Sequence, residues 1–299
     1  MQASPTAVNP WILAMRLRTL PAAAVPVVVG GAVAYRENVL QPLPLLAALI
    51  GALLIQIGAN FANDLFDFQK GADTAERVGP VRVTQAGLLT PKQVGFGAVM
   101  AFLLASLCGL YLIWFSGWPV AVIGVLSIIS AVLYVGGPIP YGYRGLGEFF
   151  VILFFGVVAV CGTYFVQALK VSPMAAIASI PIGFLCANIL VVNNVRDIET
   201  DRVADKRTLA VQFGRDFGLH EYASMLLLSH AIVLVAAIAG LLPIGSLIVL
   251  LTLPYGWKLY KRLESLTGPA LNPILGASAQ YELLFGALLS VGIVLPIRF

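Results

Sequence analysis

The sequence consists largely of apolar segments that are long enough to cross a bilayer. Hydrophobic residues make up 60% of the chain and charged residues only 11%, whereas soluble domains average roughly 45–50% and about 25%. A spanning helix needs about 20 mostly apolar residues, and no polar linker separates two folding units. We therefore expect a single all-α membrane domain, residues 1–299, built as a bundle of nine transmembrane helices with cytoplasmic cap loops. The expected spans are 20–35, 43–64, 93–115, 119–135, 147–169, 173–195, 222–242, 244–260 and 278–296.

Positive charge is unevenly divided between the two sides of this predicted bundle. Of the 18 Lys and Arg residues, 15 lie in the N-terminal segment and in the loops after the second, fourth, sixth and eighth spans. Cytoplasmic loops of membrane proteins carry an excess of Lys and Arg. The pattern predicts a multi-pass protein of the cell membrane with its N-terminus and these loops in the cytoplasm. It also accounts for the net charge of +4 without nucleic acid as a partner.

An acidic cluster follows the almost uncharged run 43–58. Asn60, Asp64 and Asp67 fall at i, i+4 and i+7, which places an amide and two carboxylates on one face of a helix. Asp73 lies a few residues further on. Ionised carboxylates are costly in or near hydrocarbon, so such a cluster indicates a functional site.

A second cluster repeats this pattern at the end of the sixth span. Asn193, Asp197 and Asp201 are spaced i, i+4 and i+8, as on one helical face. Both clusters emerge on the predicted cytoplasmic side. We expect the two carboxylate stripes to face each other across one site.

The chemistry that best suits these stripes is a metal-diphosphate site. Mg²⁺ takes oxygen ligands and usually bridges one or two carboxylates to substrate phosphates. The two histidines of the chain are not near a cysteine in sequence, so no His/Cys constellation favours zinc. Cationic side chains next to the acids can clamp the same diphosphate. Those closest to the clusters are Arg77, Arg82, Lys206 and Arg207.

A diphosphate at the mouth of an apolar bundle suggests a lipid tail that runs down inside it. Aromatic rings in that cavity would stabilise an allylic cation. The Gly- and Pro-rich loop 136–148 ends the fourth span on the same side as both clusters and contains Tyr141 and Arg144. We expect this loop to take part in binding a second substrate, the acceptor.

Three sequence motifs together resemble the UbiA superfamily of intramembrane aromatic prenyltransferases. They are Asn-Asp-x-x-Asp at 63–67, Arg-Asp-Ile-x-Thr-Asp at 196–201 and Lys-Arg-Thr-Leu-Ala at 206–210. The stretches 77–87 and 141–148 are most similar to the branch that prenylates dihydroxynaphthoate in menaquinone synthesis. The usual first motif of the superfamily has a third aspartate at position 71, where this chain has Gly71. The naphthoate branch resembles this form, in which the next acid is Asp73.

The resemblance implies nine helices around a lipid-accessible cavity, with Mg²⁺ bound by both aspartate motifs. Carried over to this chain, Asp64, Asp67, Asp197 and Asp201 are the catalytic metal ligands, with Asp73 as a further ligand. Substrate contacts are implied for Asn60, Asn63, Arg77, Arg82, Tyr141, Arg144, Asn193, Lys206 and Arg207. Arg18, at the start of the first span, is a candidate partner for a substrate carboxylate.

The implied reaction transfers a polyprenyl group from polyprenyl diphosphate to 1,4-dihydroxy-2-naphthoate, with loss of diphosphate and CO₂, to give a demethylmenaquinol. Prenylation of hydroxybenzoate or homogentisate and farnesylation of haem are alternatives within the class. A cation-coupled transporter is an alternative outside it, although transporter sites lie near the midplane of the membrane on broken helices and these acids end their spans. Prenyl chain length and oligomeric partners are left open by the sequence.

Overall fold

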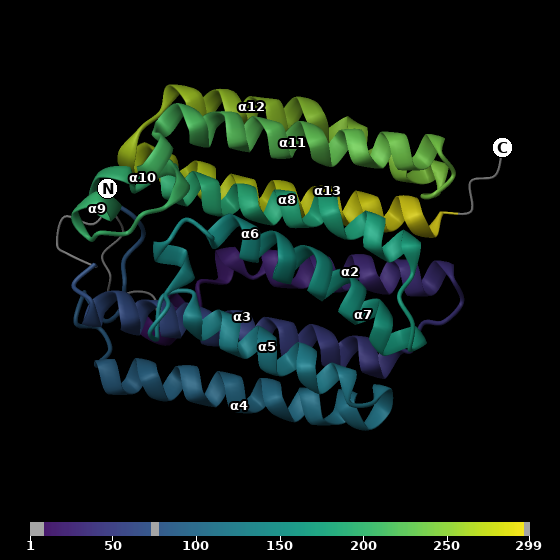
Figure 1. Ribbon diagram of the computed structural model, residues 1–299, viewed down its shortest axis with the longest axis horizontal. Helices are drawn as coiled ribbons and strands as arrows, with labels where there is room; N and C mark the ends of the chain where they lie inside the picture. The colour runs from purple at the N-terminus through teal and green to yellow at the C-terminus, as the bar shows by residue number, and fades with distance from the viewer. Residues whose placement is uncertain (1–8, 73–77, 296–299) are drawn as a thin grey trace.

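The computed structural model describes residues 9–72 and 78–295, and within these ranges the chain is helical and has no strand. Figure 1 shows the long helices lying side by side along one direction, with the short helices α9 and α10 together at one end of the bundle. The helices are α1 (Pro10–Met15), α2 (Pro21–Arg36), α3 (Pro42–Gln69), α4 (Pro91–Ser116), α5 (Pro119–Leu133), α6 (Gly147–Val151), α7 (Ala159–Ala168), α8 (Pro173–Arg196), α9 (Ile198–Val203), α10 (Leu209–Phe213), α11 (Arg215–Ile238), α12 (Leu253–Ser265) and α13 (Asn272–Val294). Shorter helical turns are η2 (Leu17–Thr19), η3 (Tyr141–Tyr143), η5 (Ile244–Thr252) and η6 (Gly268–Leu271), and the π-helical stretch η4 (Ile152–Val158) joins α6 to α7.

Local sequence signals explain where many of these helices begin and end. Thr90 and Gln93 form a capping box at the start of α4, in which the Gln93 N–H donates to Thr90 Oγ1 at 3.3 Å and the Thr90 N–H donates to Gln93 Oε1 at 2.9 Å. These bonds satisfy N–H groups that have no partner within the helix. Proline suits the first helical turn because its missing N–H is not needed there. It occupies that position in α3, α4, α5 and α8.

The predicted count of nine spans is not confirmed. Within the described ranges, six helical segments are long and apolar enough to cross a membrane, or seven if α1–η2 and α2, bent by 49°, count as one span. All nine predicted segments are largely helical. α5 has only 15 residues, and the segment predicted over 244–260 is divided between η5 and α12.

Buried apolar residues form two larger clusters and a third, small one of Leu112, Val120 and Val166. The larger cluster of buried residues comes mainly from α2, α8, α11 and α13, and α8 is the most buried of the long helices. A smaller cluster joins α1, α3 and α4 with the loop that follows α3. The end of α3 that carries the first acidic cluster packs in the smaller apolar cluster, and the end of α8 packs in the larger one. The two acidic clusters therefore meet between these two apolar clusters.

Candidate active site

The carboxylates of the first cluster are buried at the end of α3 and are held by the loop that follows it. Asp64 is 1% exposed, and its two oxygens accept hydrogen bonds from the backbone N–H groups of Val83 at 3.2 Å and Thr84 at 3.1 Å. Asp67 Oδ2 accepts a hydrogen bond from the Arg82 guanidinium at 2.9 Å. Within the described ranges, Asp67 is therefore paired with a cation, whereas Asp64 is held by uncharged donors alone.

The two asparagines next to these carboxylates have different surroundings. Asn60 is buried, and its Nδ2 donates to the Met15 carbonyl at 2.9 Å and to Thr19 Oγ1 at 3.2 Å. It therefore ties α3 to the N-terminal segment. Asn63 lines a cavity, and its Oδ1 is buried with no hydrogen-bond partner in the part of the chain that the structure describes.

The second cluster does not lie on one helix, contrary to the prediction. α8 ends at Arg196, Asp197 separates the two helices, and α9 begins at Ile198. The predicted spacing holds only for an unbroken helix, and the break at Asp197 comes directly after Arg196. Its guanidinium donates to both Asp197 oxygens at 2.7 and 2.6 Å and to Asn193 Oδ1 at 2.5 Å, so a buried arginine gathers the amide and the first carboxylate of this cluster.

Asp201 is the other carboxylate of the second cluster, and it pairs with Lys206. The Lys206 ammonium lies 3.2 Å from the Asp201 carboxylate. Burial raises the pKa of Asp201 to about 6, against the opposing effect of Lys206. Burial also lowers the pKa of Lys206, but the charges of Asp201, Asp67 and Asp197 outweigh this effect and leave the pKa above its ordinary value. Lys206 is therefore within electrostatic reach of acids from both clusters.

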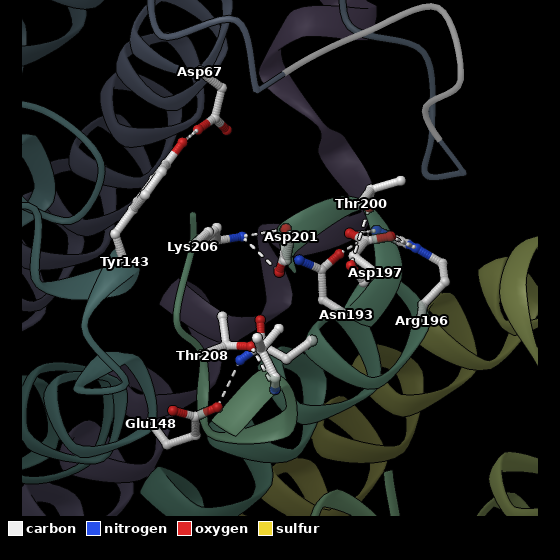
Figure 2. Close-up of polar contacts among 12 residues, drawn as sticks. Asp67, Tyr143, Glu148, Asn193, Arg196, Asp197, Thr200, Asp201, Lys206 and Thr208 are labelled. Carbon is white, nitrogen blue, oxygen red and sulfur yellow. Dashed lines mark hydrogen bonds and ion pairs between the residues drawn. The ribbon is translucent and has the colours of Figure 1, made fainter. Parts of the chain in front are cut away.

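Tyr143 connects the two clusters. Its hydroxyl donates to Asp67 Oδ1 at 2.8 Å, and its ring centroid lies 4.5 Å from Lys70 Nζ and 5.8 Å from Lys206 Nζ. Figure 2 shows Asp67 and Tyr143 on one side of Lys206 and Asp201 on the other. Because an aromatic face attracts cations, the ring helps to hold two ammonium groups beside the carboxylates. The site thus contains acids from both clusters with cations between them.

Some residues predicted for the site are exposed or lie outside the described residues. Arg18 and Arg144 are exposed, and Arg207 forms an ion pair with Asp205 at 3.0 Å in which both side chains are largely exposed. Lys206 and Arg207 are neighbours in sequence, yet Lys206 pairs with Asp201 of the second cluster and Arg207 with Asp205 at the surface. The predicted residues Asp73 and Arg77 lie outside the described residues.

Several contacts of the site were not anticipated from the sequence. Backbone donors at Val83 and Thr84 cannot be found from a side-chain motif, because any residue except proline has an N–H. Arg196 was part of the quoted motif, and its position directly before Asp197 was an available signal. Glu148 is buried and accepts a hydrogen bond from Asn194 Nδ2 at 2.6 Å, which fixes the start of α6 against α8.

A cavity of about 550 Å³ lies beside the site, between α2, α3, α4, α5 and the η4–α7 segment. Most of its lining is apolar, and its polar lining includes Gln56, Asn63 and Tyr141. The Tyr141 hydroxyl lies 2.8 Å from Ser130 Oγ, and its ring centroid is 4.1 Å from that of Phe150. Burial raises the pKa of Tyr141 to about 12, so this hydroxyl stays protonated near neutral pH. An apolar molecule with a polar head fits such a cavity.

The donor atoms present suit Mg²⁺ bound together with a diphosphate. Over residues 9–72 and 78–295, no group of three His, Cys, Asp or Glu side chains is arranged to hold a metal. Mg²⁺ is nevertheless usually bound by one or two carboxylates, with waters and substrate phosphates as the other ligands. Asp64 and Asp67 provide carboxylate oxygens, and Asn63 adds a buried amide oxygen without a described partner.

The chain matches the UbiA prenyltransferase family over residues 23–270 and belongs to that family. It is 35% identical over 295 residues to 1,4-dihydroxy-2-naphthoate octaprenyltransferase of Escherichia coli (strain K12), with 95% of each chain covered. It is 45% identical over 206 residues to the protein of the same name from Mycobacterium tuberculosis, which covers 68% of this chain and 70% of that one. The family predicted from the motifs is confirmed.

A solved structure shares the fold. The UbiA homolog from Archaeoglobus fulgidus bound to GPP and Mg²⁺ has a TM-score of 0.67 with this chain at 15% identity, and 94% of this chain and 99% of that one are covered. At this identity, the likeness shows the fold alone. The fold is thus an all-helical UbiA-type fold, and the protein is a multi-pass membrane protein.

Proposed function

We propose that this protein transfers a polyprenyl group from polyprenyl diphosphate to 1,4-dihydroxy-2-naphthoate and forms a demethylmenaquinol, the prenylated precursor of menaquinone. Family membership and the names of the relatives at 35% and 45% identity support this reaction. The observation that carries it is the meeting of two buried carboxylate clusters around Lys206 and Tyr143, beside a largely apolar cavity. A charged head and a long apolar tail require these two environments next to each other.

The donor's diphosphate would lie between the two clusters. Lys206 and Lys70 would donate hydrogen bonds to its oxygens, and Arg82 would add positive charge beside Asp67. Preorganised cations stabilise the charge that develops on a leaving group. Asp64, Asp67 and Asp201 would hold Mg²⁺, with Asn63 and Asp197 next to them. When bound, Mg²⁺ would neutralise part of the diphosphate charge.

The reaction breaks the allylic C–O bond, and its electron pair leaves with the diphosphate. A carbon of the electron-rich naphthoate ring forms the new C–C bond. The carboxyl group leaves as CO₂, and the electron pair of the bond that is broken stays on the ring. Tyr141 and its partner Ser130 line the cavity. Because the Tyr141 hydroxyl donates to the Ser130 carbonyl at 2.9 Å, we assign its oxygen as a hydrogen-bond acceptor for a hydroxyl of the naphthoate.

The orientation in the membrane is part of the proposal. The acidic ends of α3 and α8 would face the cytoplasm, together with the N-terminus and α9 and α10, because the loops there hold most of the Lys and Arg residues. In this arrangement α5 and the η5–α12 segment would also cross the bilayer, which gives the nine crossings expected from the sequence. The diphosphate head of the donor and the naphthoate acceptor would then both reach the site from the cytoplasm.

The reaction can be tested with purified protein in lipid nanodiscs. The protein receives Mg²⁺, a polyprenyl diphosphate and dihydroxynaphthoate labelled at the carboxyl carbon. Mass spectrometry should detect the prenylated naphthalenediol, and labelled CO₂ should be released in equal amount. Hydroxybenzoate and homogentisate serve as competing acceptors, and Asp64→Asn serves as the inactive control. A preference for another acceptor, or the absence of a covalent product, would overturn the proposal.

A further inference from the structure

The cavity has a polar end and an apolar end. Along α3 its lining runs from Asn63 to Ala48, which is about 22 Å at 1.5 Å per residue. The polar lining residues Gln56, Asn60 and Asn63 lie on the part of α3 closest to the carboxylates. The lining around Ala48 is apolar. A prenyl diphosphate bound with its head at the clusters would therefore run its tail toward Ala48.

Four helices around this cavity each contribute a glycine to its wall. These residues are Gly51 of α3, Gly109 of α4, Gly124 of α5 and Gly162 of α7. Glycine in a helix interior is less stable than alanine, because the unfolded glycine backbone has more freedom to lose. Gly51 lies 13 residues before Asp64, about 20 Å along the axis of α3. These glycines call for an explanation other than helix stability.

Neither backbone conformation nor helix packing accounts for the four glycines. All four lack the positive φ that favours glycine. A Cβ atom at Gly109 or Gly124 would meet nothing within 4 Å, and the nearest atoms at Gly51 and Gly162 would be 3.5 and 3.7 Å away. These distances are ordinary van der Waals contacts or open space. The four positions could each carry a methyl group without disturbing a neighbour.

Several glycines elsewhere in the bundle are closely packed. At Gly58 a Cβ atom would come within 2.6 Å of Phe102, at Gly156 within 2.8 Å of the α8 backbone, and at Gly245 within 2.6 Å of the Gly292 carbonyl. Those glycines are explained by close packing. The wall glycines are explained by the space that they leave in the cavity.

We propose that Gly51, Gly109, Gly124 and Gly162 keep the inner end of the cavity open for the last isoprene units of the donor, and thereby set the longest prenyl chain that the protein accepts. This inference rests on the proposed function, because it takes the cavity as the site of the prenyl tail. An independent sign of a ligand is the buried Oδ1 of Asn63, which lines the other end of the cavity and has no partner within the described ranges. The glycines act on specificity and take no part in the chemistry.

The test is to replace Gly109 and Gly124, singly, by leucine. The values of kcat/KM for geranyl, geranylgeranyl and octaprenyl diphosphate are then compared with those of the wild type. A branched side chain at the inner end should exclude the last units and leave the first ones undisturbed. We expect the ratio of octaprenyl to geranyl activity to fall by about tenfold or more, while activity with geranyl diphosphate stays near that of the wild type.

Gly276→Leu is the matched control. Gly276 is an interior glycine of α13 at which a Cβ atom meets nothing within 4 Å, and it does not line the cavity. It should show the same gain in helix propensity with no change in chain-length preference. Thermal unfolding of each variant in detergent checks that the fold is kept. An unchanged ratio in Gly109→Leu and Gly124→Leu, or the same change in Gly276→Leu, would contradict the inference.

A binding experiment without turnover tests this inference independently of the proposed function. Competition of each prenyl diphosphate against a fluorescent geranyl diphosphate analogue, with Mg²⁺ present, measures tail binding without turnover. If the wild type prenylates no naphthoate, the proposed function fails, and the binding ratio alone decides the inference. A weaker octaprenyl-to-geranyl binding ratio in the leucine variants supports it. Equal loss of all donors, or no loss, overturns it.

Discussion

The two acidic clusters look alike in sequence but are stabilised in different ways. In the first cluster, the loop after α3 returns to hold the carboxylates. Within the described residues, Asp64 accepts hydrogen bonds from backbone N–H groups, while Asp67 contacts Arg82 and Tyr143. In the second cluster, both carboxylates are paired with cations close by in sequence: Asp197 with Arg196, and Asp201 with Lys206. Sequence symmetry therefore does not imply equal roles.

This difference indicates that the two clusters have different roles in binding the metal and the diphosphate. A carboxylate held by uncharged donors can receive a divalent cation without first losing an ion pair. A carboxylate paired with a lysine can position that lysine for an anion. We therefore propose that Asp64 binds the metal without first losing an ion pair, and that Asp201 also positions Lys206 for the diphosphate.

Removal of the metal should have the largest effect, because it acts on both clusters. Treatment of the purified protein with EDTA should abolish formation of the prenylated product, and added Mg²⁺ should restore it. The product is measured by mass spectrometry after removal of the chelator. The proposed mechanism would be abandoned if the metal-depleted protein kept its full rate.

Asp64→Asn should lower kcat/KM by about 1000-fold, near the upper end of the effect of removing one preorganised charged or polar group. Asp201→Asn should cost less, roughly 100-fold, because Lys206 keeps its charge and can still meet the diphosphate. Steady-state kinetics on both variants measures the loss of kcat/KM in each, relative to the wild type. Equal losses would show that the two clusters play equivalent roles.

Arg196→Gln should act mainly on stability. The Arg196–Asp197 pair is buried, with side chains 0% and 9% exposed, and loss of one partner leaves a buried charge uncompensated. We expect the free energy of unfolding to fall by about 3 kcal/mol, as measured by denaturant unfolding in detergent. Arg202→Gln is the control: its pair with Glu199 is exposed, and the change should be about 0.5 kcal/mol or less. Similar values for both variants would contradict the assigned difference.

The affinity for Mg²⁺ should fall as pH decreases through about 6. Burial raises the pKa of Asp201 to about 6, from an ordinary value of about 3.9. Below that pH the carboxyl of the metal-free protein is protonated, and the metal must displace the proton. Affinity should therefore fall by up to about tenfold per pH unit below 6, as measured by Mg²⁺ titration with a bound prenyl diphosphate. In Asp201→Asn this slope should be weaker. If the slope is unchanged in that variant, the titrating group is another residue.

Tyr143→Phe should have the smallest effect. It removes the hydroxyl bond to Asp67 and keeps the ring beside both lysines. A single hydrogen bond to a charged group contributes about 1.5–3 kcal/mol, and Arg82 still holds Asp67, so we expect a loss of roughly threefold to tenfold in kcat/KM. Tyr143→Leu, which also removes the ring, should lose more. If the two variants are equal, the ring does not position the lysines.

The positions of the helices could be predicted from the sequence because the apolar pattern is local. The segment predicted over 43–64 lies within α3, and that over 173–195 lies within α8. The break at Asp197 could not be predicted from spacing, because it accompanies contacts of the Arg196 guanidinium in the folded protein. The same holds for the ring of Tyr143, whose neighbours come from α3 and from the loop after α9, both far from it in sequence.

The residue types of the site were recognisable because acids next to membrane spans are rare and costly. The pairing of each cation with its acid could not be recognised from the sequence. Lys206 and Arg207 are equally basic neighbours, but only Lys206 is turned toward Asp201, while Arg207 is paired with Asp205 at the surface. Side-chain direction in a loop depends on the backbone path, and the sequence does not determine that path locally.

The backbone N–H groups that hold Asp64 have a consequence for how this site tolerates sequence change. Any residue except proline supplies such an N–H, so hydrogen bonding to Asp64 makes no demand on the side chains at 83 and 84. The position of the loop instead depends on packing, since Val83 is fully buried in one apolar cluster with Leu89 and Val94. Natural substitutions that shorten the apolar side chains of this cluster would therefore weaken catalysis, although these residues never contact a substrate. A screen for inactive variants should find them at such apolar positions as well as among the aspartates.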